Sequence, residues 1–148
     1  MKAWFDGSNE IECSLERVKE DIKDLGKHYA GMISFIPDIS QVELEDQGDN
    51  WITIKSKECV IKRTNIVKRI EKESVLIEFD EEFLAGKIIS IKTHLLDEFT
   101  ATRTGLRHRT VINVVKAKGL FGFFYRKFAG SDVGKNLLNS YKSYLESR

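Results

Sequence analysis

The spacing of apolar residues changes along the chain, and the first regular spacing predicts a strand. Over residues 3–12 apolar and polar positions alternate, which places Phe5 and Ile11 on one face. The other face carries Asp6, Ser8, Glu10 and Glu12. A half-buried strand is therefore expected to open the chain.

A helical spacing follows this strand. Ser14 is a good helix N-cap, and Glu16 lies in the first turn, where the helix dipole favours an acid. The apolar stripe at helical spacing consists of Leu15, Val18, Ile22, Leu25 and Tyr29. Gly26 is expected to weaken or bend this helix. A second short helix is expected over residues 30–36, because Pro37 disfavours helix at the residue before it.

From Ser40 onward the period is two, which predicts a run of strands. Turn residues at 47–50, 71–73 and 85–86 separate the strands, and a threonine-rich connection is expected over 97–105. The expected strands cover residues 40–45, 51–57, 59–70, 75–79, 89–95 and 106–116. Cations on both faces of the 59–70 strand leave its register open. Because the links are short, the sheet is expected to be antiparallel.

The last segment, Gly119–Arg148, is expected to form one long helix with a wide apolar face. Apolar residues recur at positions 121, 124, 128, 137, 138, 141 and 145. Such a face has to be buried, and its nearest partner is the concave side of the preceding sheet. The predicted architecture is α+β: a curved seven-stranded antiparallel sheet wrapped around a long C-terminal helix, with two short helices after the first strand. A sheet that grips one helix in this way tends to enclose a cavity.

The composition predicts one globular domain over residues 1–148. Hydrophobic residues make up 41% of the chain and charged residues 32%, which excludes a disordered chain. The net charge of +1 gives the whole molecule no preference for nucleic acid. Residues 100–148 carry ten Lys and Arg against two acids, whereas residues 1–99 carry fourteen against twenty-one. We expect the two parts to pair; the alternative is an anionic ligand or a phospholipid surface near the last strand and helix.

The two cysteines, Cys13 and Cys59, are far apart and lack metal-ligand spacing. Two free thiols in a reducing compartment are the simpler expectation, with one disulfide as the alternative. The N-terminus carries no apolar signal segment, and no apolar run approaches the roughly 20 residues that span a bilayer. A cytoplasmic location is therefore expected.

Several local patterns, together with the order of the elements, resemble one superfamily. They are Phe35-Ile36-Pro37 in the second short helix, the Trp51 strand after a Gly-Asp turn, the segment from Arg103 to Arg109, and the Gly-Leu-Phe-Gly-Phe-Phe opening of the last helix. The segment Gly134-Lys135-Asn136-Leu137 is similar to a pattern in bacterial cyclase/dehydrase-like members. Over nearly its whole length the chain resembles the START-like, or SRPBCC, superfamily. The resemblance implies the helix-grip fold, with a deep hydrophobic pocket between the sheet and the C-terminal helix.

The resemblance also implies a ligand, because the superfamily includes lipid-transfer proteins, polyketide cyclases and coenzyme Q-binding proteins. The first hypothesis is therefore binding or transport of a hydrophobic or amphipathic small molecule, such as a lipid, a polyketide or an isoprenoid-like compound. Strand parity and helix spacing predict the side chains that line its pocket. They are Val75, Ile77, Phe79, Ile89, Ile91, Thr93, His108, Thr110, Ile112, Phe121, Phe124, Phe128 and Leu138. The polar members of this set, Thr93, His108 and Thr110, would orient the ligand.

His108 is the catalytic candidate of a second hypothesis, an enzyme of the polyketide cyclase or dehydratase type. An imidazole that faces the pocket can act as a general acid or base near neutral pH. Such an enzyme needs a second polar group beside His108, and the sequence shows none convincingly. The alternative is a core histidine that is hydrogen-bonded to a neighbour. His94 falls on the wetter face of its strand.

Metal and phosphate sites find no support in the residue spacing. The three histidines form no metal-binding pattern, so neither a metal nor a cofactor is expected. The segment 130–136 is one residue short of a phosphate loop and lacks Ser or Thr after Lys135. Gly130 is interpreted instead as a place where the helix packs closely or bends.

The aromatic cluster over 121–128 is interpreted as core or pocket lining, with an outward ring such as Phe123 able to touch a membrane or a partner. A third hypothesis is accordingly a structural or partner-binding module without a ligand. A monomer or a homodimer is expected, with at most transient membrane contact.

Overall fold

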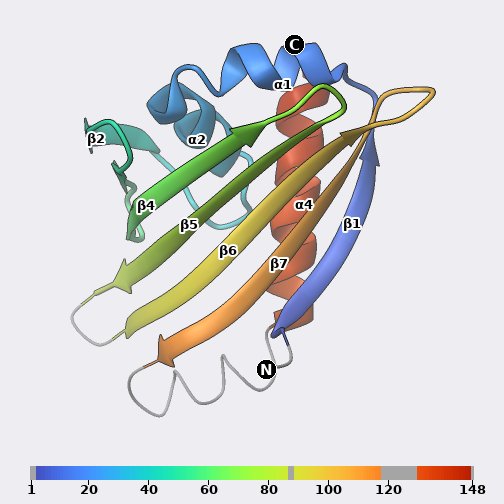
Figure 1. Ribbon diagram of the computed structural model, residues 1–148. Coiled ribbons are helices and arrows are strands. Elements are labelled where there is room, and N and C mark those ends of the chain that lie inside the picture. Colours follow the sequence, from blue (N-terminus) through green and yellow to red (C-terminus); the bar gives the residue numbers. More distant parts are fainter. Residues whose placement is uncertain (1–2, 87–88, 118–129, 148) are drawn as a thin grey trace.

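One curved antiparallel sheet organises the molecule. The computed structural model describes residues 3–86, 89–117 and 130–147. Seven strands form the sheet in the order β1-β7-β6-β5-β4-β3-β2. Their bounds are β1 Phe5–Ile11, β2 Glu43–Gln47, β3 Ile52–Lys55, β4 Val60–Ile70, β5 Ser74–Ala85, β6 Ile89–Ala101 and β7 Leu106–Ala117. The long helix α4 (Gly130–Glu146) runs across one face of this sheet (Figure 1).

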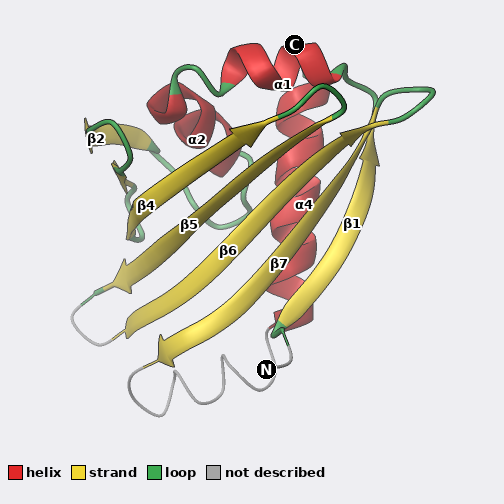
Figure 2. Ribbon diagram, in the orientation of Figure 1, coloured by secondary structure: helices red, strands yellow, loops and turns green. Residues whose placement is uncertain are grey.

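All three described helices lie on the same side of the sheet, as Figure 2 shows. Besides α4 they are α1 (Leu15–Asp21) and α2 (Leu25–Ile33), which follow β1 directly. This arrangement confirms the predicted α+β fold, its seven strands and its helix pair after the first strand. Of the helices that the structure describes, none is both long and apolar enough to cross a membrane.

The break between α1 and α2 lies at residues 22–24, and the prediction that Gly26 bends the helix is wrong. Asp24 is the N-cap of α2, since its carboxylate accepts a hydrogen bond from the backbone N–H of Lys27 at 3.1 Å. Because this N-cap pairs a backbone N–H group that the start of a helix leaves unpaired, a new helix begins after Asp24. The apolar stripe is buried as predicted, from Leu15 to Tyr29. The second helix ends at Ile33, three residues earlier than expected.

Strand β6 is longer than predicted, because residues 97–101 belong to it and not to a connection. Its period of two continues past Leu95, so Asp97 and Phe99 are buried on the same face. Thr100, the threonine of this stretch that lies in the strand, is β-branched and fits it. The true turn covers only 102–105, where the Thr102 N–H donates to the Gly105 carbonyl at 2.9 Å.

A local irregularity explains why the sequence left the register of the 59–70 strand undetermined. Strand β4 contains a bulge between Thr64 and Val67, where Asn65 adopts a left-handed backbone with a φ of 53°. A bulge shifts the parity of all later residues, so cations appear on both faces. On the N-terminal side of the bulge, Arg63 shares a face with the buried Ile61.

Helix α4 packs mainly along β1 and makes smaller contacts with α2 and β7. Gly134 permits this close packing, because a Cβ atom built on it would overlap atoms of the Phe5 ring. The structure shows a close approach at Gly134, and the prediction for Gly130 stays a prediction. The expected first part of the long helix, residues 119–129, lies outside the described residues.

Candidate functional site

Cross-strand pairing places the predicted pocket residues of the strands on the concave face, which is the face toward the helices. Those buried there are Val75, Ile77, Phe79, Ile91, Thr93, His108, Thr110 and Ile112, and Ile89 is half-buried. Leu138 of α4 is buried as well. Phe121, Phe124 and Phe128 lie outside the described residues. That this set lines a ligand pocket stays a prediction.

Three side chains of this face, Asp97, His108 and Thr110, form a buried polar cluster. The carboxylate oxygen Oδ1 of Asp97 lies 2.7 Å from Nε2 of His108, and it accepts a hydrogen bond from Thr110 Oγ1 at 2.6 Å. Burial acts to raise the pKa of Asp97, but the hydrogen bond from His108 and the attraction to its ring hold that pKa below its usual value. An ionised Asp97 can only accept, so Nε2 of His108 carries the shared hydrogen.

Aromatic rings hold the His108 imidazole in place. It stacks on Phe99 with a centroid distance of 4.5 Å and an interplanar angle of 7°. The ring of Tyr141, from α4, meets the imidazole in a T-shaped arrangement, also with a centroid distance of 4.5 Å. The imidazole is therefore fixed by packing as well as by its hydrogen bond.

Asp97 is the second polar group that the sequence did not reveal. The sequence analysis assigned residues 97–105 to a connection, so Asp97 was not expected to lie on the sheet. The signal that could have found it is the continued alternation of Leu95, Asp97 and Phe99, which places all three on one face.

A second pair of charges, Arg63 and Glu81, lies farther along the same face. Nε of Arg63 donates to Oε1 of Glu81 at 3.0 Å, and Nη2 lies 3.0 Å from the same oxygen. Only 1% of the Arg63 side chain and 16% of the Glu81 side chain are exposed. Burial opposes the guanidinium charge, yet the Glu81 carboxylate raises the pKa of Arg63 above its usual value. The sequence analysis missed Arg63, although its parity with Ile61 indicated this face.

Aromatic rings also surround the guanidinium of Arg63. Its central carbon lies 4.4 Å from the centre of the Tyr29 ring and 4.6 Å from that of Phe79. Both distances suit a cation–π interaction. Burial raises the pKa of the Tyr29 hydroxyl far above its usual value, so this hydroxyl keeps its proton.

Three buried polar atoms of this face have no hydrogen-bond partner among the described residues. They are Nη1 of Arg63, Oγ1 of Thr93 and Nδ1 of His108. Buried polar atoms are nearly always paired in folded proteins, by protein, water or ligand. Three unpaired atoms on one concave face therefore mark it as the candidate site.

A further buried cluster joins α1 and α2 to α4. His28 Nδ1 lies 2.6 Å from Oδ2 of Asp21, and the Tyr144 hydroxyl donates to both carboxylate oxygens of Asp21 at 2.8 and 3.0 Å. Nε2 of His28 lies 3.2 Å from the hydroxyl of Tyr141. These contacts pair the polar atoms of His28 within the protein, so we assign this cluster to helix packing.

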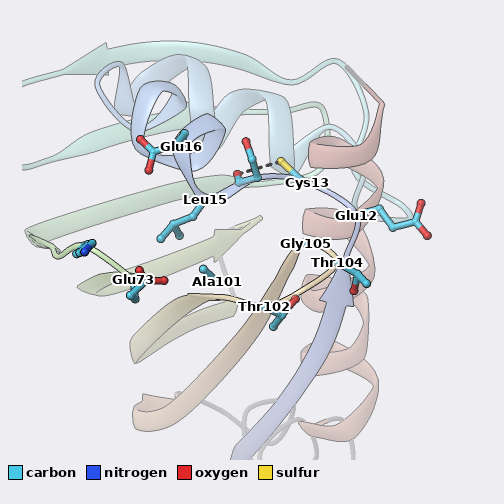
Figure 3. A pocket seen from close by; sticks show the side chains of 11 residues that line it. Glu12, Cys13, Leu15, Glu16, Glu73, Ala101, Thr102, Thr104 and Gly105 are labelled. Atoms are coloured by element: carbon cyan, nitrogen blue, oxygen red, sulfur yellow. Dashed lines mark hydrogen bonds between the residues drawn. The ribbon is translucent and has the colours of Figure 1, made fainter.

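A surface pocket of about 640 Å³ opens at one end of the sheet (Figure 3). It is formed by the start of α1, by Lys72 and Glu73, and by the turn 102–105. Cys13 lies in its wall, and burial raises the pKa of this thiol, which makes it a weak nucleophile near neutral pH. The unpaired buried atoms lie elsewhere, so this pocket is not the candidate site.

His94 lies on the opposite, convex face of the sheet, and its predicted place on the wetter face is confirmed by a side chain that is 35% exposed. It lies between Asp80 and Glu78, with each ring nitrogen 2.7 Å from a carboxylate oxygen.

Within residues 3–86, 89–117 and 130–147, no group of three or more His, Cys, Asp or Glu side chains is arranged to hold a metal ion.

Comparison with known proteins gives matches of structure and not of sequence. No family model and no curated protein matches the chain. A conserved protein from Geobacillus kaustophilus superposes with a TM-score of 0.68 at 11% identity, over 96% of this chain and 91% of that chain. A STAR-related lipid transfer protein from Xanthomonas axonopodis gives a TM-score of 0.63 at 11% identity, over 95% of this chain and 84% of that chain.

A third solved structure, of a protein from Thermus thermophilus, gives a TM-score of 0.54 at 15% identity, over 96% of both chains. Identities this low establish a shared fold and nothing beyond it. Together with the strand order and the position of α4, these matches show that the chain shares its fold with these proteins, and that fold is the helix-grip fold expected from the resemblance.

Proposed function

We propose that this protein binds and carries a hydrophobic or amphipathic small molecule between the concave face of its sheet and its C-terminal helix. One observation carries the proposal: Arg63, Thr93 and His108 each bury a polar atom without a described partner, on a face whose other buried side chains are mostly apolar. An unpaired buried polar atom costs about 1–3 kcal/mol, so a ligand that pairs with it removes that cost. The lipid-transfer protein that shares the fold supports the same class of ligand.

Native mass spectrometry of freshly purified protein tests this proposal directly. We expect a bound species of defined mass that disappears after solvent extraction, and an extracted molecule with an apolar body and a polar end. The stripped protein should take up the extracted molecule again. A protein that carries no small molecule and takes up none from a panel of lipid, polyketide and isoprenoid compounds would contradict the proposal.

Thr93→Val separates a binding role from a structural one. Valine has nearly the shape of threonine but no hydroxyl, so the variant loses an unpaired polar atom. We expect the free protein to be as stable as the parent or up to about 1 kcal/mol more stable, and ligand affinity to fall. Thr100→Val, at an exposed position of the same strand as Thr93, is the matched control and should change neither quantity.

A second candidate function is catalysis, and the Asp97–His108 pair favours it. With Nε2–H directed at Asp97, the unpaired Nδ1 of His108 is free to act as a base. In a dehydration, Nδ1 would accept the proton next to a substrate carbonyl and pass it to the departing hydroxyl, so that water leaves and a carbon–carbon double bond forms. This role corresponds to the cyclase or dehydratase hypothesis.

His108→Ala distinguishes the carrier from the enzyme. For a carrier we expect most of the ligand affinity to remain, measured by native mass spectrometry. For an enzyme we expect conversion of the bound compound to fall by about 100-fold or more, the usual contribution of a general base. Stripped protein incubated with the extracted compound, with the products analysed by mass, decides between them.

A further inference from the structure

Four side chains from two neighbouring strands form a compact block around the His108 imidazole. The register pairs Asp97 of β6 with Thr110 of β7, and Phe99 of β6 with His108 of β7. Residues two apart on a strand share a face, so all four side chains lie on the concave face, and each is at most 2% exposed. The ring of His108 therefore has one aromatic and two polar neighbours within the sheet.

We propose that Thr110 is a positioning residue for His108. Together with Asp97 it fixes Nε2 as the ring nitrogen that carries the shared hydrogen, which leaves Nδ1 as the nitrogen that can accept a proton from a substrate. The inference rests on the second candidate function, catalysis by His108. It gives Thr110 a different role from the one expected from the sequence, in which its hydroxyl would orient the ligand.

Packing fixes the plane of the His108 ring but not which edge of the ring meets Asp97. Phe99 stacks on the ring with an interplanar angle of 7°. A half-turn about the Cβ–Cγ bond of His108 keeps the ring in this plane and exchanges the positions of Nε2 and the carbon Cε1. Stacking therefore permits both orientations, and the polar neighbours have to decide between them.

The two polar neighbours of the ring both contact Nε2. This nitrogen lies 2.7 Å from Oδ1 of Asp97 and 3.0 Å from Oγ1 of Thr110. Thr110 donates its own hydrogen to Asp97 at 2.6 Å, so its oxygen can only accept from Nε2. Two acceptors thus converge on one nitrogen, and a hydrogen on that nitrogen satisfies both.

The hydroxyl of Thr110 adds a constraint that the carboxylate alone lacks. Its hydrogen bond goes to Oδ1 of Asp97, the same oxygen that contacts His108, and so holds this oxygen at the edge of the ring. Thr110 is itself stiff, because a β-branched side chain has few χ1 rotamers. A reversed edge or a reversed tautomer would forfeit the hydrogen bonds of Nε2 in a buried place, which is costly.

NMR spectra of the nitrogen-15-labelled, full-length protein test the first part of the inference. Long-range correlations within the imidazole ring report which ring nitrogen carries a hydrogen. For the parent we expect Nε2 of His108 to carry one and to be protected from exchange with water. A parent spectrum in which Nε2 lacks a hydrogen would overturn the inference, and this measurement needs no variant.

Thr110→Val removes the hydroxyl and keeps the shape of the side chain. The measured quantity is the rate at which the Nε2 hydrogen of His108 exchanges with water, relative to the backbone amides of β7 in the same sample. We expect this ratio to rise at least about tenfold, because the ring loses an acceptor while the strand stays in place. A purely structural role would speed both exchange rates equally, so an unchanged ratio would overturn the inference.

Two further variants show that the hydroxyl of Thr110 is the cause. Thr110→Ser keeps a hydroxyl and should restore the ratio of the parent. Thr93→Val removes a different buried hydroxyl of the same face and should leave the His108 signals unchanged. A ratio that rises in Thr93→Val as much as in Thr110→Val would overturn the inference.

Turnover tests the catalytic part, with stripped protein and the compound extracted from it. We expect Thr110→Val to lower kcat by about tenfold or more and to leave KM within a factor of about two. A raised KM with unchanged kcat would overturn the inference, because Thr110 would then act on the ligand itself. If the parent converts no compound, the catalytic function fails, and the ring spectra still decide whether Thr110 positions His108.

Discussion

At the scale of single residues, the notable feature is the number of polar groups in the core. Asp97 is 2% exposed and His108 is fully buried, yet the carboxylate accepts hydrogen bonds from two side chains. Such a cluster is stable only while its members pair with one another, because each desolvated group left alone is costly. Removing one member should therefore cost more than the same change at the surface.

Asp97→Asn provides the test. The variant replaces charge-assisted hydrogen bonds by weaker neutral ones, so we expect a loss of about 1–3 kcal/mol in the free energy of unfolding at pH 7. Urea denaturation measures it. The control is Asp6→Asn, which removes the surface pair between Asp6 and Arg109 and should cost at most about 1 kcal/mol. Equal losses in the two variants would contradict a special role for burial.

The stability of the protein should also depend on pH through Asp97. The pKa of Asp97 is lower in the folded than in the unfolded protein. The ionised carboxylate therefore contributes fully to the free energy of unfolding above the pKa of the unfolded state, about 4. This contribution is lost as the pH falls from there toward the pKa of the folded state. Below pH of about 4 the unfolding free energy of the parent should therefore fall more steeply than that of Asp97→Asn. Identical slopes would contradict this assignment.

At the scale of elements, two contacts fix α4 against the rest of the molecule. One is the polar cluster in which Tyr144 of α4 donates to Asp21 of α1. The other is the approach of Gly134 to the Phe5 ring on β1. The first contact holds the C-terminal end of the helix to the helix pair, and the second holds its N-terminal half to the sheet edge. The side of α4 that faces the candidate site is thereby determined.

Gly134→Ala tests the second contact. Alanine favours helix over glycine by about 1 kcal/mol, but its Cβ would overlap the Phe5 ring. We expect the overlap to dominate, with a net loss of about 1–3 kcal/mol measured by urea denaturation. The exposed neighbour Lys135 supplies the control, since Lys135→Ala should stay within about 0.5 kcal/mol of the parent. A stabilised Gly134→Ala would show that the ring moves aside freely.

At the scale of the whole molecule, the fold brings the basic and acidic parts of the chain together. Strand β7, which is rich in arginine, pairs with β1 and β6, and Arg109 forms two hydrogen bonds with Asp6. These contacts agree with the expectation that the two parts of the chain pair.

Ligand binding should appear as a change in the stability of the whole molecule. A compound present at 100 times its dissociation constant stabilises the folded state by about 2.7 kcal/mol. For a chain of this size, that energy raises Tm by about 5–10 °C. Differential scanning calorimetry of stripped protein with the molecule extracted from it measures the shift, and an unrelated globular protein treated in the same way is the control. A Tm that does not respond at saturation would argue against binding.

The local pattern of the sequence determined the kinds of element, their order and the face on which most side chains lie. Periods of 2 and 3.6 residues depend only on neighbouring positions, so Val75, Ile77 and Phe79 are predictable as one buried face. The stripe from Leu15 to Tyr29 is predictable for the same reason, even though Asp24 divides its helix.

Only the tertiary structure decided which polar side chains meet. Arg63 reaches Glu81, and Asp97 reaches His108, because cross-strand register aligns β4 with β5 and β6 with β7. That register depends on turn lengths and on bulges such as the one after Thr64, and a slip of one residue would turn each side chain to the opposite face. The candidate site is therefore a product of long-range pairing, which no local pattern contains.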